Sequence, residues 1–159
     1  MTEQSTDTAR GTGKFGCIGL TAVLVIGLLL VVVSTWRLHR HVAAYEARFS
    51  GPEWVRLEGQ AIEETEPITE PTLIFGPEIV LHGATEDIAI QGGDAELHGH
   101  YTGNVFFLGR NFDLAPDGVV EGVIEVSGAR HVTIRGISEG GVEGAWDRLY
   151  QSTPPAKAP

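Results

Sequence analysis

A short repeat bounded by glycines constrains the fold of this chain more than any other feature. Glycines four residues apart recur as three pairs, at spacings of 19 and 18 residues: Gly99/Gly103, Gly118/Gly122 and Gly136/Gly140. A weaker copy precedes them, so that four copies cover residues 79–144. A unit of 16–19 residues with short strands is too short for the hairpins of a sandwich. It suits one coil of a β-solenoid.

The residues between these glycines predict how the coils fill their interior. In a solenoid, alternate residues point inward, and equivalent positions stack at the strand spacing of about 4.8 Å. Two aliphatic ladders are expected, namely Leu81, Leu97, Leu114 and Ile134, and Ile88, Val105, Ile124 and Val142. We therefore predict an all-β domain over residues 72–150, a β-solenoid of about four coils. A glycine-rich antiparallel sandwich with evenly spaced turns is the alternative.

An uncharged apolar run precedes this domain and predicts a single transmembrane helix. Residues 15–36 are 22 consecutive uncharged residues, and a helix of this length can cross a hydrocarbon core of about 30 Å. Lys14 and Arg37 bracket the run closely. A cleaved signal peptide is disfavoured, because the run ends in Ser-Thr-Trp-Arg and lacks a small-x-small cleavage site. Residues 1–14 are expected to be disordered.

The basic residues that flank the run predict the orientation of the domain. Arg10 and Lys14 lie before it, whereas four arginines follow within about 20 residues, namely Arg37, Arg40, Arg48 and Arg56. This count favours a single-pass protein of the inner membrane with its β domain in the cytoplasm. A lysine that touches the apolar run is also typical of uncleaved export anchors, so the outward orientation stays open.

Two segments between anchor and domain, and one after it, are predicted from composition. Residues 37–50 are expected to form a juxtamembrane helix with one apolar stripe of Leu38, Val42, Tyr45 and Phe49. Residues 51–71 are acidic and contain prolines, which predicts an extended linker. Residues 151–159 are expected to be a disordered tail.

Charge and residue content argue against several functions. The chain has 11 Lys+Arg against 21 Asp+Glu, and its net charge of −10 disfavours nucleic acid as a partner. Cys17 is the single cysteine, so no intrachain disulfide or multi-cysteine metal site is possible. The paired acidic residues of the chain indicate a solvated surface rather than a general acid and base. We expect no catalytic site, cofactor or small-molecule substrate.

Three histidines are the best metal candidates, although a metal site is not expected. His98 and His100 lie two apart on one predicted strand, and His82 occupies the position equivalent to His98 one coil earlier. Stacked histidines can bind Zn²⁺ or Cu²⁺, but outward polar ladders are common on solenoids.

The end of the repeat carries the candidate residues for capping or assembly. Terminal coils of a solenoid leave backbone groups and an apolar cross-section uncovered. Trp146, Leu149 and Tyr150 follow the last repeat. They are predicted either to fold over this end as a cap or to form a surface that binds another copy.

Residues 114–144 resemble the bactofilins, a bacterial polymer-forming cytoskeletal family. The resemblance rests on "V-E-G" steps, at Val120-Glu121-Gly122 before a β-branched strand and at Val142-Glu143-Gly144. It implies a right-handed β-helix that stacks end to end into nucleotide-free filaments near the inner face of the membrane. This chain departs from the family in having a full membrane span.

Two functions follow as hypotheses. The first is a membrane-tethered, bactofilin-like scaffold that associates with itself or recruits protein partners. The alternative is a single-span envelope module whose β domain faces outward and binds a lipid, glycan or protein.

Overall fold

A computed structural model describes residues 13–152 of the chain, with side chains for 23–36 and 39–152. The chain divides into two compact units, Met1–Ala43 and Ala44–Pro159, which we describe separately. The predicted disordered segments lie almost entirely outside the described residues.

The first unit is built on helix α1, which runs without a break from Gly13 to Arg48 and continues into the second unit. The predicted span 15–36 lies within it, and so does the predicted juxtamembrane helix 37–50 except for its last two residues. The stretch Val23–Arg48 is long and apolar enough to cross a membrane, with a hydropathy of 1.6, and side chains 23–36 are all exposed. Ser34 and Thr35 donate their hydroxyls to carbonyls one turn earlier, at 2.7 Å. These bonds satisfy both hydroxyls within an apolar helix.

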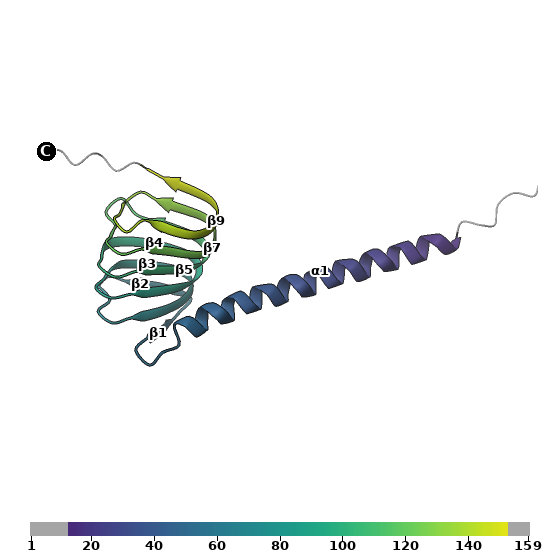
Figure 1. The fold of residues 1–159 in the computed structure, drawn as a ribbon, viewed down its shortest axis with the longest axis horizontal. Coiled ribbons are helices and arrows are strands. Elements are labelled where there is room, and N and C mark those ends of the chain that lie inside the picture. The colour runs from purple at the N-terminus through teal and green to yellow at the C-terminus, as the bar shows by residue number, and fades with distance from the viewer. Residues whose placement is uncertain (1–12, 153–159) are drawn as a thin grey trace, which may run out of the picture. The chain divides into compact units, whose positions relative to one another are not determined.

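The second unit is a parallel β-solenoid of about six turns (Figure 1). Every pairing between its strands is parallel, which excludes the antiparallel sandwich. The strands are β1 Val55–Glu58, β2 Ala61–Glu64, β3 Thr72–Ala84, β4 Ile88–Tyr101, β5 Val105–Leu114, β6 Val119–Val120, β7 Ile124–Ile134, β8 Ile137–Ser138 and β9 Val142–Gln151.

Two boundaries of the predicted domain were wrong. Residues 51–71 are not a linker, because β1 and β2 pair in register with β3 and form a first coil. Pro67 and Pro71 lie between strands, where no ladder N–H is required. At the other end, β9 extends to Gln151, which had been assigned to the tail. The solenoid therefore has two coils more than the four predicted.

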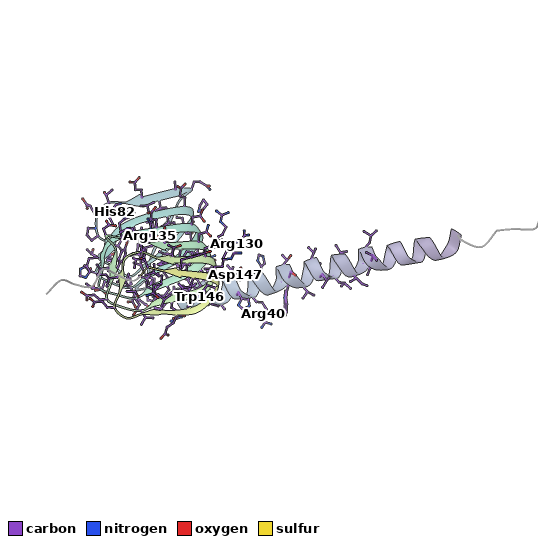
Figure 2. The ribbon with its side chains drawn as sticks, turned by 90° about the horizontal axis from the view of Figure 1, so that it is seen from above. Arg40, His82, Arg130, Arg135, Trp146 and Asp147 are labelled. Carbon is purple, nitrogen blue, oxygen red and sulfur yellow. The ribbon has the colours of Figure 1, made fainter. Side chains whose placement is uncertain are left out.

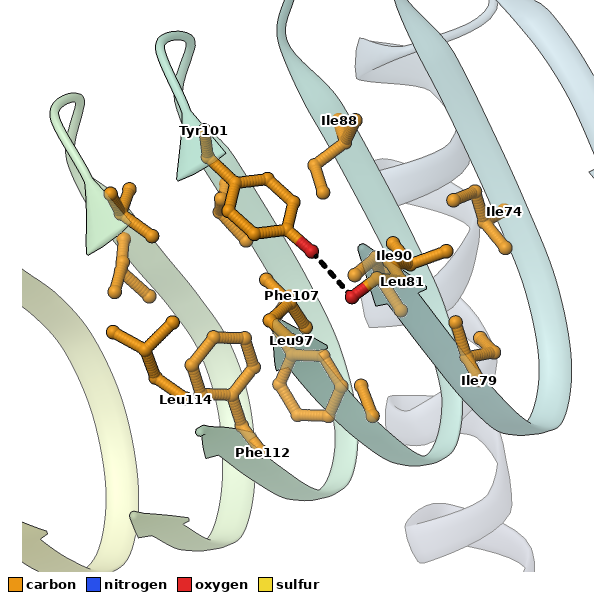
Figure 3. Close-up of a cluster of buried hydrophobic side chains, with 14 of the residues drawn as sticks. Ile74, Ile79, Leu81, Ile88, Ile90, Leu97, Tyr101, Phe107, Phe112 and Leu114 are labelled. Carbon is orange, nitrogen blue, oxygen red and sulfur yellow. Dashed lines mark hydrogen bonds between the residues drawn. The ribbon is translucent and has the colours of Figure 1, made fainter. Parts of the chain in front are cut away.

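Both predicted aliphatic ladders are confirmed. Leu81, Leu97, Leu114 and Ile134 align from strand to strand, as do Ile88, Val105, Ile124 and Val142. All but Val142 are fully buried or nearly so. Each such side chain contributes about 1.5–3 kcal/mol of burial free energy. Tyr101 is also buried in this core, and its hydroxyl donates to the carbonyl of Leu81 at 2.9 Å (Figure 3).

Stacked glycines form the corners between the sides of the coils. Gly92 aligns with Gly76 in one neighbouring strand and with Gly109 in the other. A Cβ on Gly92 would overlap the carbonyl oxygen of Gly76, so a side chain cannot fit between the coils here. A Cβ on Gly122 would likewise overlap the carbonyl of Gly103. Close backbone approach therefore explains the second glycine of each repeated pair.

Candidate assembly surface

The last coil of the solenoid is open on one side. Strand β9 pairs with β7 along one edge, and no described strand pairs with its other edge. Trp146, Leu149 and Tyr150 belong to β9 itself, where they align with Ala129, Val132 and Thr133. They therefore form the last coil and do not fold over it as a cap. An unpaired strand edge is a template for another strand.

Side chains of this coil remain accessible where earlier coils are closed. Leu149 is 38% exposed, although Val132, which aligns with it in β7, is fully buried. Tyr150 is 52% exposed. Trp146 packs partly against the core and lies beside Asp147 on the last coil (Figure 2). The exposure of Leu149 arises because a seventh coil is missing, since its position is an inward one.

The first coil forms the opposite end of the same ladders. Its inward positions are Val55, Leu57, Ile62 and Glu64, because they align with the buried side of β3. Val55 is 44% exposed, whereas Ile62 is only 7% exposed. The first coil is thus more closed than the last one, but it also has a strand edge without a partner among the described residues.

Besides an inward ladder from Leu57 to Gly144, three more inward ladders run through all six coils. One begins at Val55 and ends at Val142, and a second begins at Ile62 and ends at Leu149. The third begins at Glu64 and ends at Gln151, with four aliphatic residues between them. Sequence reasoning missed the first member of each ladder, because it assigned β1 and β2 to a linker.

The outer face of one solenoid side is covered by the end of α1. Tyr45 and Phe49 are buried, and they pack with Leu73 and Ala89 on the outside of β3 and β4. The Tyr45 hydroxyl lies 2.9 Å from the carbonyl oxygen of Phe106 and 3.1 Å from that of Ile90. Burial raises the pKa of Tyr45 far above its usual range. The predicted helical stripe at Tyr45 and Phe49 therefore serves as a docking surface.

An ion pair holds the same turn in place. The Arg48 guanidinium binds the Glu125 carboxylate through two nitrogens, with Nη2 at 3.0 Å from Oε2, and lies 4.6 Å from the ring centre of Phe106. Outward apolar residues on β3 and β5 could have indicated this docking site from the sequence, namely Phe75, Phe106 and Leu108. Because the chain's own helix covers this face, the coil ends are the exposed candidates for assembly.

The three histidine candidates do not converge on one point. His82 and His98 stack with ring centres 5.0 Å apart, as the repeat predicted. Carboxylates lie close to one of them, since His98 is 2.9 Å from Asp117 and 3.3 Å from Glu96. His100 pairs separately with Glu121 at 2.9 Å. Across residues 13–152, no three such side chains are grouped as a metal site.

Other charges on the outer surface are paired between coils. Arg110 binds Asp94 at 2.7 Å, and Arg135 binds Asp113 at 2.8 Å. The Arg110 guanidinium lowers the pKa of Asp94, as the His98 ring does for Asp117. These contacts satisfy carboxylates of neighbouring strands in the manner of cross-strand pairs. They suggest a structural role for these acids.

Comparisons with known proteins add no relatives. No protein-family model matches the chain, and no curated protein or solved structure is significantly similar to it.

Proposed function

We propose that this protein is a membrane-anchored, bactofilin-like scaffold whose solenoids associate end to end. The last coil of one copy pairs with the first coil of the next. Such a head-to-tail contact does not close on itself and generates open filaments. Its anchor is a single span in the inner membrane, with the solenoid on the cytoplasmic side, as the arginines after the apolar run favour.

The observation that carries the proposal is the continuity of the ladders across such a junction. If β9 continues into β1 and β2 of the next copy in the same register, Val142 meets Val55 and Leu149 meets Ile62. Aliphatic side chains thus meet at both contacts. The half-exposed apolar surface at Val55 and Leu149 would then be buried. Such burial stabilises a contact by about 25 cal/mol for each Å² of apolar surface.

Charge and volume also match in this register. Glu143 forms no ion pair within the described residues, and it would align with Arg56 of the next copy. On the inner side, Gly144 would align with Leu57, so that the smallest residue meets a large one. Opposite charges and complementary volumes on neighbouring strands stabilise their pairing.

The resemblance of residues 114–144 to bactofilins supports the same conclusion from a different direction, because that family assembles end to end. The docked turn at Tyr45 supports it as well. It covers the apolar outer face of β3 to β5, and no described strand pairs with the free edges of the first and last coils.

A charge exchange tests the proposal. The full-length protein in detergent is expected to form oligomers whose size rises with concentration in sedimentation velocity. Glu143→Arg or Arg56→Glu alone should weaken association about 5- to 10-fold, through like charges at the junction, and the double exchange should restore most of it. Glu86→Arg, at an exposed turn in the middle of the solenoid, is the matched control.

Two results would contradict the proposal. One is a wild-type protein that stays monomeric at every concentration, which would favour the alternative of a binding module. The other is association that both single exchanges leave unchanged.

A further inference from the structure

We propose that protons regulate the end-to-end junction, which tightens as pH falls because Glu64 lies at an inward position there. This inference rests on the proposed function and names the regulation of the same surface. Glu64 aligns with Leu81, and the ladder continues through Leu97, Leu114 and Ile134, which are all fully buried or nearly so. An ionisable residue thus begins a ladder that is otherwise aliphatic up to Gln151.

In the separate protein this carboxyl group is accessible to water. Glu64 is half-buried, and it forms no salt bridge within the described part of the chain. It is the last inward residue of β2, on the coil that has no described coil before it. Water can therefore solvate its negative charge as long as the end is free.

Stacking changes this environment. Gln151 is the inward residue at the other end of the ladder, and it would cover Glu64 of the next copy at the strand spacing of about 4.8 Å. Burial disfavours the charged form of a carboxyl group. The Gln151 side chain can still accept a hydrogen bond from the protonated acid or donate one to the carboxylate. The junction therefore favours the protonated state without excluding the charged one.

The neighbouring charges act in the same direction. Strands β1 and β2 of the first coil carry Arg56, Glu58, Glu63 and Glu64, a net charge of −2, and β9 of the last coil carries Glu143, Asp147 and Arg148, a net charge of −1. Other titratable groups near Glu64 are Glu66, on the segment after β2, and His82, beside Leu81 in β3. Tyr101 donates its hydroxyl to the carbonyl of Leu81, and Tyr150 lies beside Gln151 in β9. Protonation of these carboxylates or of His82 lowers the repulsion between two negative ends.

The direction follows from linkage. If the stacked state binds more protons than the separate copies do, falling pH shifts the equilibrium toward stacking. Uptake of one proton changes the association constant by at most about tenfold for each pH unit. Between about pH 7.5 and about pH 5, association of the full-length protein should therefore rise, and it should rise most steeply toward the acidic end.

The experiment measures association of the full-length protein in detergent by sedimentation velocity across this pH range. Glu64→Gln removes the charge without changing the size of the side chain. It should raise association about tenfold near pH 7.5 and flatten the pH dependence. Glu63→Gln, the outward neighbour, is the control and should keep the wild-type slope. Gln151→Glu should abolish association near neutral pH and make the pH dependence steeper.

The outcomes separate the two proposals. If the protein associates but Glu64→Gln keeps the wild-type slope, or if association weakens on acidification, the proton inference is wrong and end-to-end assembly stands. If neither the wild type nor Glu64→Gln associates at any pH, both are wrong.

Discussion

Two buried tyrosines show how single residues fix this structure. Tyr45 closes the contact between the end of α1 and the solenoid, with its hydroxyl near the carbonyls of Ile90 and Phe106. Tyr101 lies inside the core and donates to the carbonyl of Leu81. In both cases a hydrogen bond offsets the cost of burying a polar group. Burial raises the pKa of each phenol.

This burial predicts a loss of stability in alkali. A group with a raised pKa in the folded state stabilises the fold fully below its pKa in the unfolded chain, which is about 10 for tyrosine. That contribution declines as pH rises above this value. We expect unfolding above about pH 10, and Tyr45 and Tyr101 should ionise only together with it. A titration of tyrosinate absorbance alongside circular dichroism measures both. Reversible ionisation of all three tyrosines before any loss of β structure would contradict this account.

At the scale of the strands, the glycine corners set how closely the coils approach. We expect an alanine substitution to affect stability very differently at two glycines of this solenoid. Gly92→Ala should destabilise the fold by about 1–3 kcal/mol or more, because the new Cβ overlaps the carbonyl of Gly76 and backbone there cannot yield without breaking the ladder. Gly128→Ala places its Cβ in ordinary contact, 3.7 Å from Leu108, and should change stability by less than about 0.5 kcal/mol.

Urea unfolding of the two variants checks this prediction. Equal losses of stability in both would show that close backbone approach does not determine the corner glycines.

The elements differ in how far their sequences predict them. The aliphatic ladders from Leu81 to Ile134 could be predicted, because the solenoid places equivalent residues at a nearly constant spacing. The first coil could not, because β1 and β2 have four residues each and three of these eight residues are glutamates. Such short strands resemble a linker until their pairing with β3 is known.

The same physical reason applies to the candidate site. The residues of the last coil were identified in the sequence, since Trp146 and Leu149 interrupt a glycine-rich pattern. Their partners in the first coil were hidden within the supposed linker. Tyr45 contacts the carbonyls of Ile90 and Phe106, which lie 45 and 61 positions later in the sequence. Helical periodicity carries no information about contacts at such a separation.

At the scale of the whole molecule, the chain combines an apolar helix able to span a membrane with a six-turn solenoid whose ends remain unpaired within the described residues. The two ends present matching ladders, which is the requirement for one copy to continue another. Self-association through these ends is therefore the central claim, and its register is specific enough to be tested at single positions.

Disulfide trapping tests this claim most directly. The test introduces Glu63→Cys and Tyr150→Cys together into a Cys17→Ser background. Both positions face outward, and they align with each other through the intervening strands. Across a head-to-tail junction, their Cα atoms would lie about 5 Å apart, within the range for a disulfide. Asp147→Cys in place of Tyr150→Cys shifts the register by three residues, or about 10 Å, beyond that range.

Oxidation of membranes that contain the matched pair should give a ladder of covalent multimers on a non-reducing gel. Each single cysteine variant should give dimers at most, and the shifted pair should give no ladder. A matched pair that yields no more than the single variants, or a shifted pair that yields the same ladder, would contradict end-to-end assembly in this register.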